Sequence, residues 1–318
     1  MAPHDRLGRR AFLRRAGSCA AHVALMGWAA PASARARWTA QARHPVVAEE
    51  PWGRLEQLDE GIWALVSTPL EDRTTLCNGG IVAGRNGVAL LEGFASQAGA
   101  RWMAEQARRL TGRSATHVVL THYHADHSAG LGGAAGEGRR VLTTGITRDL
   151  TRERVQGVPA ELLEEVALVD ARRPSELDLG DRSLLLVPRR GHTASDVSVE
   201  IPDASVVFCG DLVWNGMFPN YVDAAPSRLS SEARLLRTTG ARVYVPGHGP
   251  LADAAALDAY LGLLDHVEEA ARDALRRGLS AEEAGAAYRL PPGLEDWTLF
   301  SPGYFARAIG AWLTELMA

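Results

Sequence analysis

Short apolar runs alternate with longer amphipathic segments along most of this chain, and this alternation constrains the fold more than any other feature. The short runs are rich in β-branched residues and predict strands at residues 62–66, 80–83, 88–91, 117–120, 183–187, 197–201, 205–208 and 242–245. The longer segments predict helices at residues 97–110, 146–155, 227–237 and about 253–277. Because strands and helices interleave without a repeat, we expect one layered α/β domain whose strand-end loops carry the function.

The first residues form a separate segment with a basic start. Arg9 and Arg10 precede an apolar stretch at residues 16–30, and Ala32 to Ala34 offers a small-x-small cleavage site. This order is typical of a twin-arginine signal peptide, which we assign to residues 1–34; a basic amphipathic surface helix is the alternative. The stretch is too short and too polar to span a membrane. We therefore expect a periplasmic or secreted protein, exported folded, with no stable membrane anchor after signal cleavage.

Residues 35–54 carry Pro, Arg and Glu without apolar periodicity, so we expect a linker there and the functional domain at residues 55–318. Removal of residues 1–34 takes away five Arg and one Asp, which changes the net charge from −4 to −8. An acidic domain argues against a nucleic-acid partner and leaves a small molecule as the expected substrate. The sequence indicates no oligomeric state.

The segment Thr-His-Tyr-His-Ala-Asp-His at residues 121–127 contains three of the 10 histidines of the chain. It forms the loop that leaves the predicted strand at residues 117–120. In an extended segment, His122 and His124 point to the same side and can bind one metal ion. Asp126 and His127 come after the chain turns and can reach a second ion. A polar loop that is merely rich in histidine is the alternative.

Three other stretches place a metal-binding side chain beside a glycine shortly after a predicted strand. Taken singly, each could be a turn or a cap, but strand ends on one edge of a sheet converge, and imidazole and carboxylate are ligands that zinc takes. We predict two ligand sets with Asp211 as a bridge: His122, His124 and His192 for one ion, and Asp126, His127 and His248 for the other. The expected cofactor is two Zn²⁺, with iron or manganese as alternatives.

The order of these pieces, HxHxDH, Gly-His-Thr, Gly-Asp and Gly-His-Gly-Pro, resembles that of the metallo-β-lactamase superfamily of metallohydrolases. The resemblance runs from about Leu55 past His248 and rests on motifs specific to that superfamily. It implies an αββα sandwich, a single domain with the metal pair at one edge and a helical region at the C-terminus. One departure is Glu92, where many members carry Asp; the resemblance leaves open whether the longer side chain changes the support of the ligand loop.

Asp211 separates branches within the superfamily. β-Lactamases of the binuclear subclasses lack this bridging aspartate, so the chain looks more like hydroxyacylglutathione hydrolases, lactonases and exported zinc hydrolases of quinoprotein relay systems. Residues 210–216 are most similar to the last group. The resemblance implies an exported dinuclear zinc metallohydrolase that cleaves a carbonyl-centred bond of an ester, thioester or lactone. Two alternatives stay open: a β-lactamase proper, and a metal-dependent redox or quinoprotein accessory protein.

The expected chemistry uses two ions about 3.5–4 Å apart, which lower the pKa of a bridging water and supply hydroxide near neutral pH. Asp126 is the expected catalytic residue, because it can orient this hydroxide and act as a base besides binding the second ion. Residues 214–221 pass near the metals, and their large side chains either line a substrate pocket or pack the loop against the domain: Trp214, Met217, Phe218 and Tyr221. The sequence also leaves open whether Cys77 and Cys209 form a disulfide.

Overall fold

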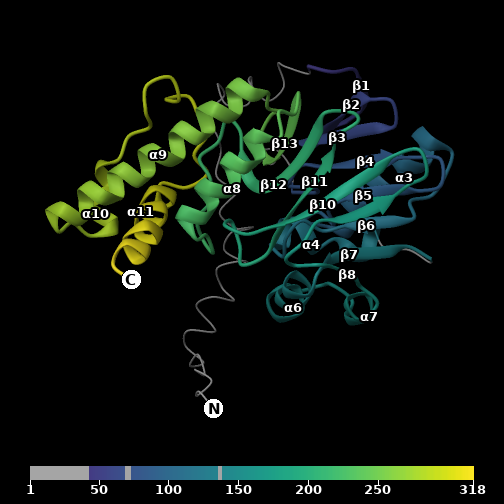
Figure 1. The fold of residues 1–318 in the computed structure, drawn as a ribbon, viewed down its shortest axis with the longest axis horizontal. Helices are drawn as coiled ribbons and strands as arrows, with labels where there is room; N and C mark the ends of the chain where they lie inside the picture. Colours follow the sequence, from purple (N-terminus) through teal and green to yellow (C-terminus); the bar gives the residue numbers. More distant parts are fainter. Residues whose placement is uncertain (1–42, 69–72, 135–137) are drawn as a thin grey trace, which may run out of the picture.

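The computed structural model describes residues 43–68, 73–134 and 138–318, which form two β-sheets with helices on both outer sides (Figure 1). The larger sheet has its strands in chain order: β1 (Val46–Glu50), β2 (Gly53–Asp59), β3 (Ile62–Ser67), β4 (Gly79–Ala83), β5 (Val88–Leu91), β6 (His117–Val119), β7 (Arg140–Thr144) and β8 (Ala167–Val169). Strands β1 to β5 pair antiparallel, whereas β5 to β8 run parallel. The smaller sheet has the order β13 (Val243–His248), β12 (Val206–Trp214), β11 (Asp196–Ile201), β10 (Ser183–Arg189) and β9 (Ser175–Asp178).

Some of the helices have capping residues that mark their ends in the sequence. The described helices are α3 (Gln97–Thr111), α4 (Ala125–Ser128), α5 (Leu131–Ala134), α6 (Gly145–Arg154), α7 (Ala160–Glu164), α8 (Pro226–Thr238), α9 (Ala254–Arg277), α10 (Ala281–Ala287) and α11 (Gly303–Leu316). The side chain of Asp253 caps the start of α9, and Gly278 ends it in a left-handed conformation with φ 66°. Ser280 and Glu283 form a capping box at α10.

The alternating side chains of β3 show how the larger sheet builds two apolar layers. Ile62 and Ala64 face the second sheet and belong to the core between the sheets. Trp63 and Leu65 point to the opposite side, where they share a core with Met103 of α3. This alternation is the period of two that a strand buried on both faces requires. The outer face of the larger sheet is therefore covered by α3.

The smaller sheet repeats this arrangement in β12. Val206 and Phe208 lie in the core between the sheets, whereas Val207 and Cys209 belong to the apolar core that also contains residues of α8, α9 and α11. The layers are therefore helix, sheet, sheet and helix, with α9, α10 and α11 to one side of the sandwich (Figure 1). The expected αββα sandwich with a C-terminal helical region is confirmed.

Two expectations need correction at this level. Residues 46–54 were expected in a linker, but they form β1 and the start of β2, which pair with each other and extend the larger sheet. Leu55 of β2 is fully buried and Leu58 is partly buried, although the sequence of this strand shows little periodicity. Strands β7, β8 and β9 were not predicted, since all three are short, and β7 and β9 also carry several polar residues. The expected signal peptide at residues 1–34 lies outside the described residues.

Strand β12 is longer than expected and holds the most important carboxylate of the site. The predicted strand stopped at residue 208, but β12 continues to Trp214 with every residue buried. Asp211 therefore lies inside the strand and not at its end. Gly210 has φ 53°, and the pairing with β13 is irregular on both sides of it. This local bulge bends the strand immediately before Asp211.

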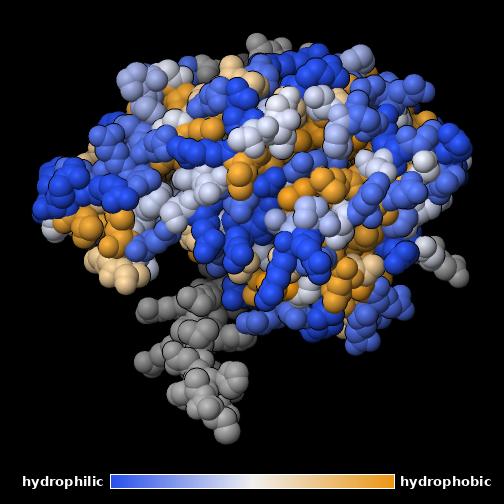
Figure 2. All heavy atoms as spheres, in the orientation of Figure 1, coloured by the Kyte–Doolittle hydropathy of each residue, from blue (hydrophilic) through white to orange (hydrophobic). Residues whose placement is uncertain are grey.

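The surface seen in Figure 2 is largely hydrophilic, with apolar residues in smaller groups between the charged ones. Within the described ranges, none of the helices is both apolar enough and long enough to cross a membrane.

Candidate metal centre

The first predicted ligands lie on the loop that connects β6 to α4. Strand β6 runs parallel between β5 and β7, so this loop leaves the sheet at the carboxyl ends of its parallel strands. The backbone N–H of His127 donates to the carbonyl oxygen of His124 at 3.0 Å, which begins the single turn of α4. The Ser128 hydroxyl donates to the carbonyls of Tyr123 and His124. These bonds hold the loop in one tight conformation.

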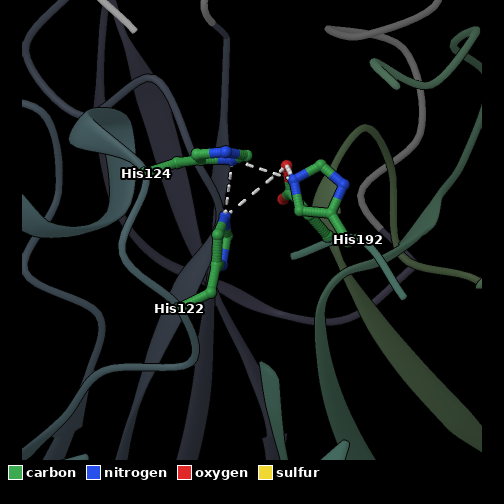
Figure 3. A group of neighbouring side chains, drawn as sticks. His122, His124 and His192 are labelled. Carbon is green, nitrogen blue, oxygen red and sulfur yellow. Dashed lines mark hydrogen bonds and ion pairs between the residues drawn. The ribbon is translucent and has the colours of Figure 1, made fainter. Parts of the chain in front are cut away.

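Three imidazoles converge to form the first ligand group. Nδ1 of His124 lies 3.2 Å from Nε2 of His122 and 2.9 Å from Nε2 of His192. Figure 3 shows these three rings pointing toward one another, with His192 on a different segment from His122 and His124. Oδ2 of Asp211 lies 3.2 Å from Nε2 of His192. One ligand atom from each of the four side chains lies within 4.8 Å of the others.

A second group lies on the other side of Asp211. Nε2 of His248 is 3.1 Å from Oδ2 of Asp126, and Nε2 of His127 is 3.7 Å from the same oxygen. Oδ1 of Asp211 lies 3.0 Å from Nε2 of His127 and 3.4 Å from Nε2 of His248. The structure thus brings all seven predicted ligands together. Asp211 directs one oxygen to each group.

The geometry of both groups fits a metal ion. Ligand atoms that bind one zinc ion tetrahedrally at about 2.0–2.2 Å lie about 3.3–3.6 Å from one another, and most of the contacts given above fall near that range. Both oxygens of Asp211 and Nε2 of His127 and of His248 are buried without a well-formed hydrogen bond to any described residue. Buried polar atoms normally have such partners. The imidazole nitrogens and carboxylate oxygens therefore have the number, type and spacing expected of ligands for two cations.

The charges of the cluster depend strongly on one another. Burial raises the pKa of Asp211, but the neighbouring His248 and His127 hold it well below its ordinary value. Burial opposes the charged form of His248, yet Asp211 and Asp126 raise its pKa to about 9. Burial and the nearby His127 keep the pKa of His122 well below its ordinary value. Protonated imidazoles thus balance the buried carboxylates, and cations that bind here displace those protons.

Glu92 supports the ligand loop despite its additional methylene group. Its Oε1 accepts a hydrogen bond from the Thr121 hydroxyl at 2.5 Å and lies 3.1 Å from Nδ1 of His127. The backbone of Glu92 has φ 81°, a left-handed conformation that is unusual for a residue with a side chain. The longer side chain therefore still reaches the ring nitrogen of His127 that faces away from Asp211.

Asp223 is a functional residue that the sequence analysis missed. Its Oδ2 lies 3.0 Å from Nε2 of His124, the ring nitrogen that faces away from the ligand group. The hydroxyl of Tyr123 donates to the same oxygen, and Nη1 of Arg154 lies 3.6 Å from Oδ1. Burial raises the pKa of Asp223, but these contacts with His124, Tyr123 and Arg154 hold it well below its ordinary value. No local pattern marks this residue, because it lies 99 positions after His124.

Asp196 was also missed and holds the loop that carries His192. Its carboxylate accepts from the backbone N–H groups of His192 and Thr193 and from the Thr193 hydroxyl. Gly191 has φ 147°, and a Cβ atom there would lie 2.5 Å from the backbone nitrogen of Leu229. The glycine of Gly-His-Thr is therefore required by close packing against α8. The spacing from Thr193 to Asp196 was a signal for this turn.

The large side chains of residues 214–221 pack the loop against the domain. Trp214, Met217 and Phe218 are fully buried in the core shared with α9 and α11. The Trp214 ring lies 4.2 Å from the His248 ring, and the Phe218 ring lies 4.8 Å from the Phe305 ring. Burial therefore favours the packing interpretation for these three residues over a substrate wall. Tyr221 belongs to the same core but also lines a cavity.

That cavity, of about 580 Å³, lies beside the first ligand group. Tyr123 and Asp223, both in contact with each other, form part of its wall, and Ala194 lines it two residues after His192. Helices α6 and α11 complete the enclosure. We refer to it below as the α6–α11 cavity.

The remaining candidates have structural roles. Cys77 and Cys209 are buried free thiols and do not pair with each other. Burial raises the pKa of Cys77 to about 12, so its sulfur stays protonated beside the ligand loop. Outside the cluster, Nδ1 of His266 lies 2.8 Å from the Tyr288 hydroxyl and joins α9 to the segment after α10.

Comparisons with known proteins agree with this architecture. The family model described as metallo-beta-lactamase superfamily matches residues 72–248. The metallo-beta-lactamase type 2 of Bacillus sp. (strain 170) is 23% identical over 217 residues, which cover 66% of this chain and 81% of that protein. The solved metallo-beta-lactamase from Pontibacter korlensis superposes with a TM-score of 0.58 and 24% identity, covering 67% of this chain and 99% of the other.

A larger solved protein shares the fold over more of this chain. The inverting sec-alkylsulfatase Pisa1 from Pseudomonas sp. has a TM-score of 0.64 at 14% identity, covering 80% of this chain and 49% of its own. At such identities the superpositions show a common fold and nothing more specific. The family model, however, spans more than half of the 318 residues and includes the whole ligand cluster. The chain therefore belongs to the metallo-β-lactamase superfamily and is a metal-dependent hydrolase.

Proposed function

We propose that this protein is a dinuclear zinc hydrolase that cleaves a carbonyl-centred bond in a small-molecule ester, thioester or lactone. The position of Asp211 carries the proposal. Its two oxygens lie 3.2 Å from His192 of the first group and 3.0 Å from His127 of the second. A carboxylate between two such sets of ligands reduces the repulsion between two cations and holds them close enough to act on one substrate.

The residues divide between the two ions according to these contacts. His122, His124 and His192 would hold the first ion, and Asp126, His127 and His248 the second, with Asp211 shared. When bound, such ions act as Lewis acids and lower the pKa of bound water to near neutrality. Asp126 directs Oδ2 toward His248 and His127, so its Oδ1 is the atom that we expect to orient the nucleophile and accept its proton.

The surroundings of the cluster shield its ligands from bulk water. The seven ligand side chains are no more than 2% exposed, so charges that develop during the reaction are screened less than in water. Glu92 and Asp223 fix the rings of His127 and His124 from behind. The chain therefore provides a preorganised site, and no nucleophilic serine is required.

A second candidate function is hydrolysis of β-lactams. It is favoured by the curated relatives named metallo-beta-lactamase type 2 at 23% and 25% identity. We rank it lower because Asp211 stands at the bridging position, which resembles the branch of ester, thioester and lactone hydrolases. A redox role with iron is a third possibility that the same experiments address.

The test combines metal analysis with a substrate panel on the purified full chain. We expect two zinc ions per chain and turnover of at least one aryl ester, thioester or lactone. Asp265→Asn serves as a control, since Asp265 pairs with Arg234 at the surface and should leave both results unchanged. Turnover of nitrocefin alone would assign the β-lactamase function instead. Bound iron together with dioxygen uptake would assign the redox role.

We also propose that the protein acts after export as a folded, metal-loaded domain. The support is the Arg9-Arg10 pair and the small-residue site at residues 32–34. Replacement of both arginines by Lys should leave an uncleaved precursor in the cytoplasm, detected by fractionation and immunoblotting. Normal appearance of the mature form in the periplasm would contradict the proposed route.

A further inference from the structure

The α6–α11 cavity is lined by neighbours of the first ligand group. Tyr123 is the residue before His124, and Asp223 lies 3.0 Å from Nε2 of His124. Ala194 lines the cavity on the loop that carries His192. The cavity wall therefore contains residues next to His124 and His192, with Asp223 between the cavity and the His124 ring. With a volume of about 580 Å³, the cavity has a size typical of small-molecule sites.

One wall of the cavity comes from a part of the chain beyond the family match. Ala311 and Thr314 of α11 line it, and they lie one helical turn apart on the same face of that helix. Leu150 of α6 lines it from another element. Thr314 and Ala194 are exposed, whereas Tyr123 is buried. The cavity thus opens to solvent near Thr314 and Ala194 and ends at the ligand loop.

The charges in the wall of this cavity neutralise each other. Arg154 and Asp223 are its ionised lining residues, and Nη1 of Arg154 lies 3.6 Å from Oδ1 of Asp223. Both also contact the Tyr123 hydroxyl, and the Arg154 guanidinium lies 5.4 Å from the centre of the Tyr123 ring. An ionised group that entered would lose hydration without finding an unpaired opposite charge among these residues.

The rest of the lining is mainly aliphatic. It comprises Leu150, Ala194, Val222, Ala224 and Ala311. Such a surface gains free energy when it covers apolar substrate atoms, and each additional CH₂ group contributes about 0.8 kcal/mol. The small side chains at three of these five positions leave the space that an extended chain would need.

We propose that the α6–α11 cavity receives an uncharged, apolar acyl chain of the substrate and that Ala311 of α11 limits the length of that chain. This inference rests on the proposed function for the reaction itself. It assigns the substrate class as esters or thioesters of medium-chain fatty acids. It also assigns a specificity-determining role to the C-terminal helix.

The first test is a series of 4-nitrophenyl esters from acetyl through butyryl and hexanoyl to octanoyl. For the wild type we expect kcat/KM to rise by about fourfold per CH₂ group until the cavity is filled, the factor that corresponds to 0.8 kcal/mol. Ala311→Phe should lower kcat/KM for the octanoyl ester at least about 10-fold and leave the acetyl ester within about threefold. Ala255→Phe, at an exposed position of α9, should match the wild type.

Two further measurements separate folding and function from specificity. Leu150→Trp reduces the cavity from α6, so it tests the same idea if Ala311→Phe does not fold. Isothermal titration with octanamide, a neutral probe that is not an ester, should show binding to wild type and Ala255→Phe and none to either filled variant. Octanamide binding without turnover of any ester keeps this inference and rejects the proposed function. Turnover of esters without chain-length dependence, or equal octanamide binding by all variants, overturns the inference.

Discussion

At the scale of single residues, Asp211 is the side chain on which both ligand groups depend. Its oxygens divide between His192 and His127, and neither oxygen has a well-formed hydrogen bond to a described residue. A buried carboxylate in such a position needs positive charge close to both oxygens. Burial raises the pKa of Asp211, and the nearby His248 and His127 hold it well below its ordinary value. The ionised carboxylate therefore depends on positive charge close to it.

Asp211→Asn should therefore separate the two metal sites. Asn keeps the shape but removes the charge, and neutral amides are poor zinc ligands. We expect the first group, with its three histidines, to keep its ion, whereas the second binds much more weakly and turnover falls strongly. Elemental analysis should give two ions per chain for the wild type and close to one for the variant, with recovery only at high added zinc. Two tightly bound ions and normal turnover in the variant would contradict the bridging role and favour the β-lactamase alternative.

Asp223→Asn tests the support of His124. The carboxylate accepts a hydrogen bond from Nε2 of His124, which favours the tautomer whose Nδ1 can bind the metal. Loss of such a supporting carboxylate reduces metal affinity by about 10–100-fold. The measurement is zinc competition with a chromogenic chelator. Asp258→Asn removes a surface carboxylate that pairs with Arg237 and should leave zinc affinity unchanged.

At the scale of secondary structure, the site depends on how closely β12 and β13 approach each other. Gly247 of β13 lies against Asp211 of β12, and a Cβ atom at Gly247 would lie 1.9 Å from Oδ1 of Asp211. Asn78 holds the same region, because its amide donates to the carbonyls of Pro246 and Gly249. The strand ends thus position the bridging carboxylate through backbone contacts as well as side chains.

Gly247→Ala should move the Asp211 carboxylate away from the second group. Overpacking at a tight position costs about 1–3 kcal/mol, so we expect a lower melting temperature together with loss of one zinc ion. Gly262→Ala is the matched control: Gly262 is exposed on α9 and has no neighbour within 4 Å of an added Cβ. It should raise the free energy of unfolding by about 0.5–1 kcal/mol and leave zinc content unchanged. Equal zinc content in both variants would show that the close approach at Gly247 does not position Asp211.

At the scale of the whole molecule, the predicted metal ligands come from segments of both sheets of the sandwich. The cluster takes side chains from the loop after β6 and the following α4, from the loop between β10 and β11, and from β12 and β13. Cations bound there connect the larger sheet to the smaller one. Metal binding is therefore linked to the stability of the entire fold.

Removal of metal should consequently destabilise the protein as well as inactivate it. Ions that bind only the folded state stabilise it by about 2.7 kcal/mol when free metal is 100 times the dissociation constant. We expect a chelator to abolish turnover and lower the melting temperature in differential scanning calorimetry, and zinc to restore both. A melting temperature and a turnover that are both indifferent to chelation would reject the metal-dependent mechanism.

Local sequence was sufficient where the physical cause is local. Hydrophobic periodicity predicted α3, α6, α8 and α9 to within one or two residues, and cap residues such as Asp253 and Gly278 marked the ends of α9. The residues of the cluster could also be predicted to lie together, because several imidazoles and carboxylates at strand ends indicate a shared site even though each one alone could belong to a turn or a cap. β1 and β2 were missed, since their stability comes from pairing, β1 with β2 and β2 with β3, and not from their own pattern.

The arrangement around the site was decided only by the tertiary structure. Asp223 contacts His124 although it lies 99 positions later in the sequence. Ala311 of α11 and Leu150 of α6 line the same cavity. No local sequence pattern predicts either arrangement. The same is true of Trp214, Met217 and Phe218, whose aromatic and sulfur-containing side chains suit a substrate pocket and a core equally well. In the structure these three side chains are buried against α9 and α11 and belong to the core. The sequence by itself determined which side chains can bind metal, whereas the packing of distant elements determined their supports and the cavity beside them, because those contacts depend on the assembled sheets and helices.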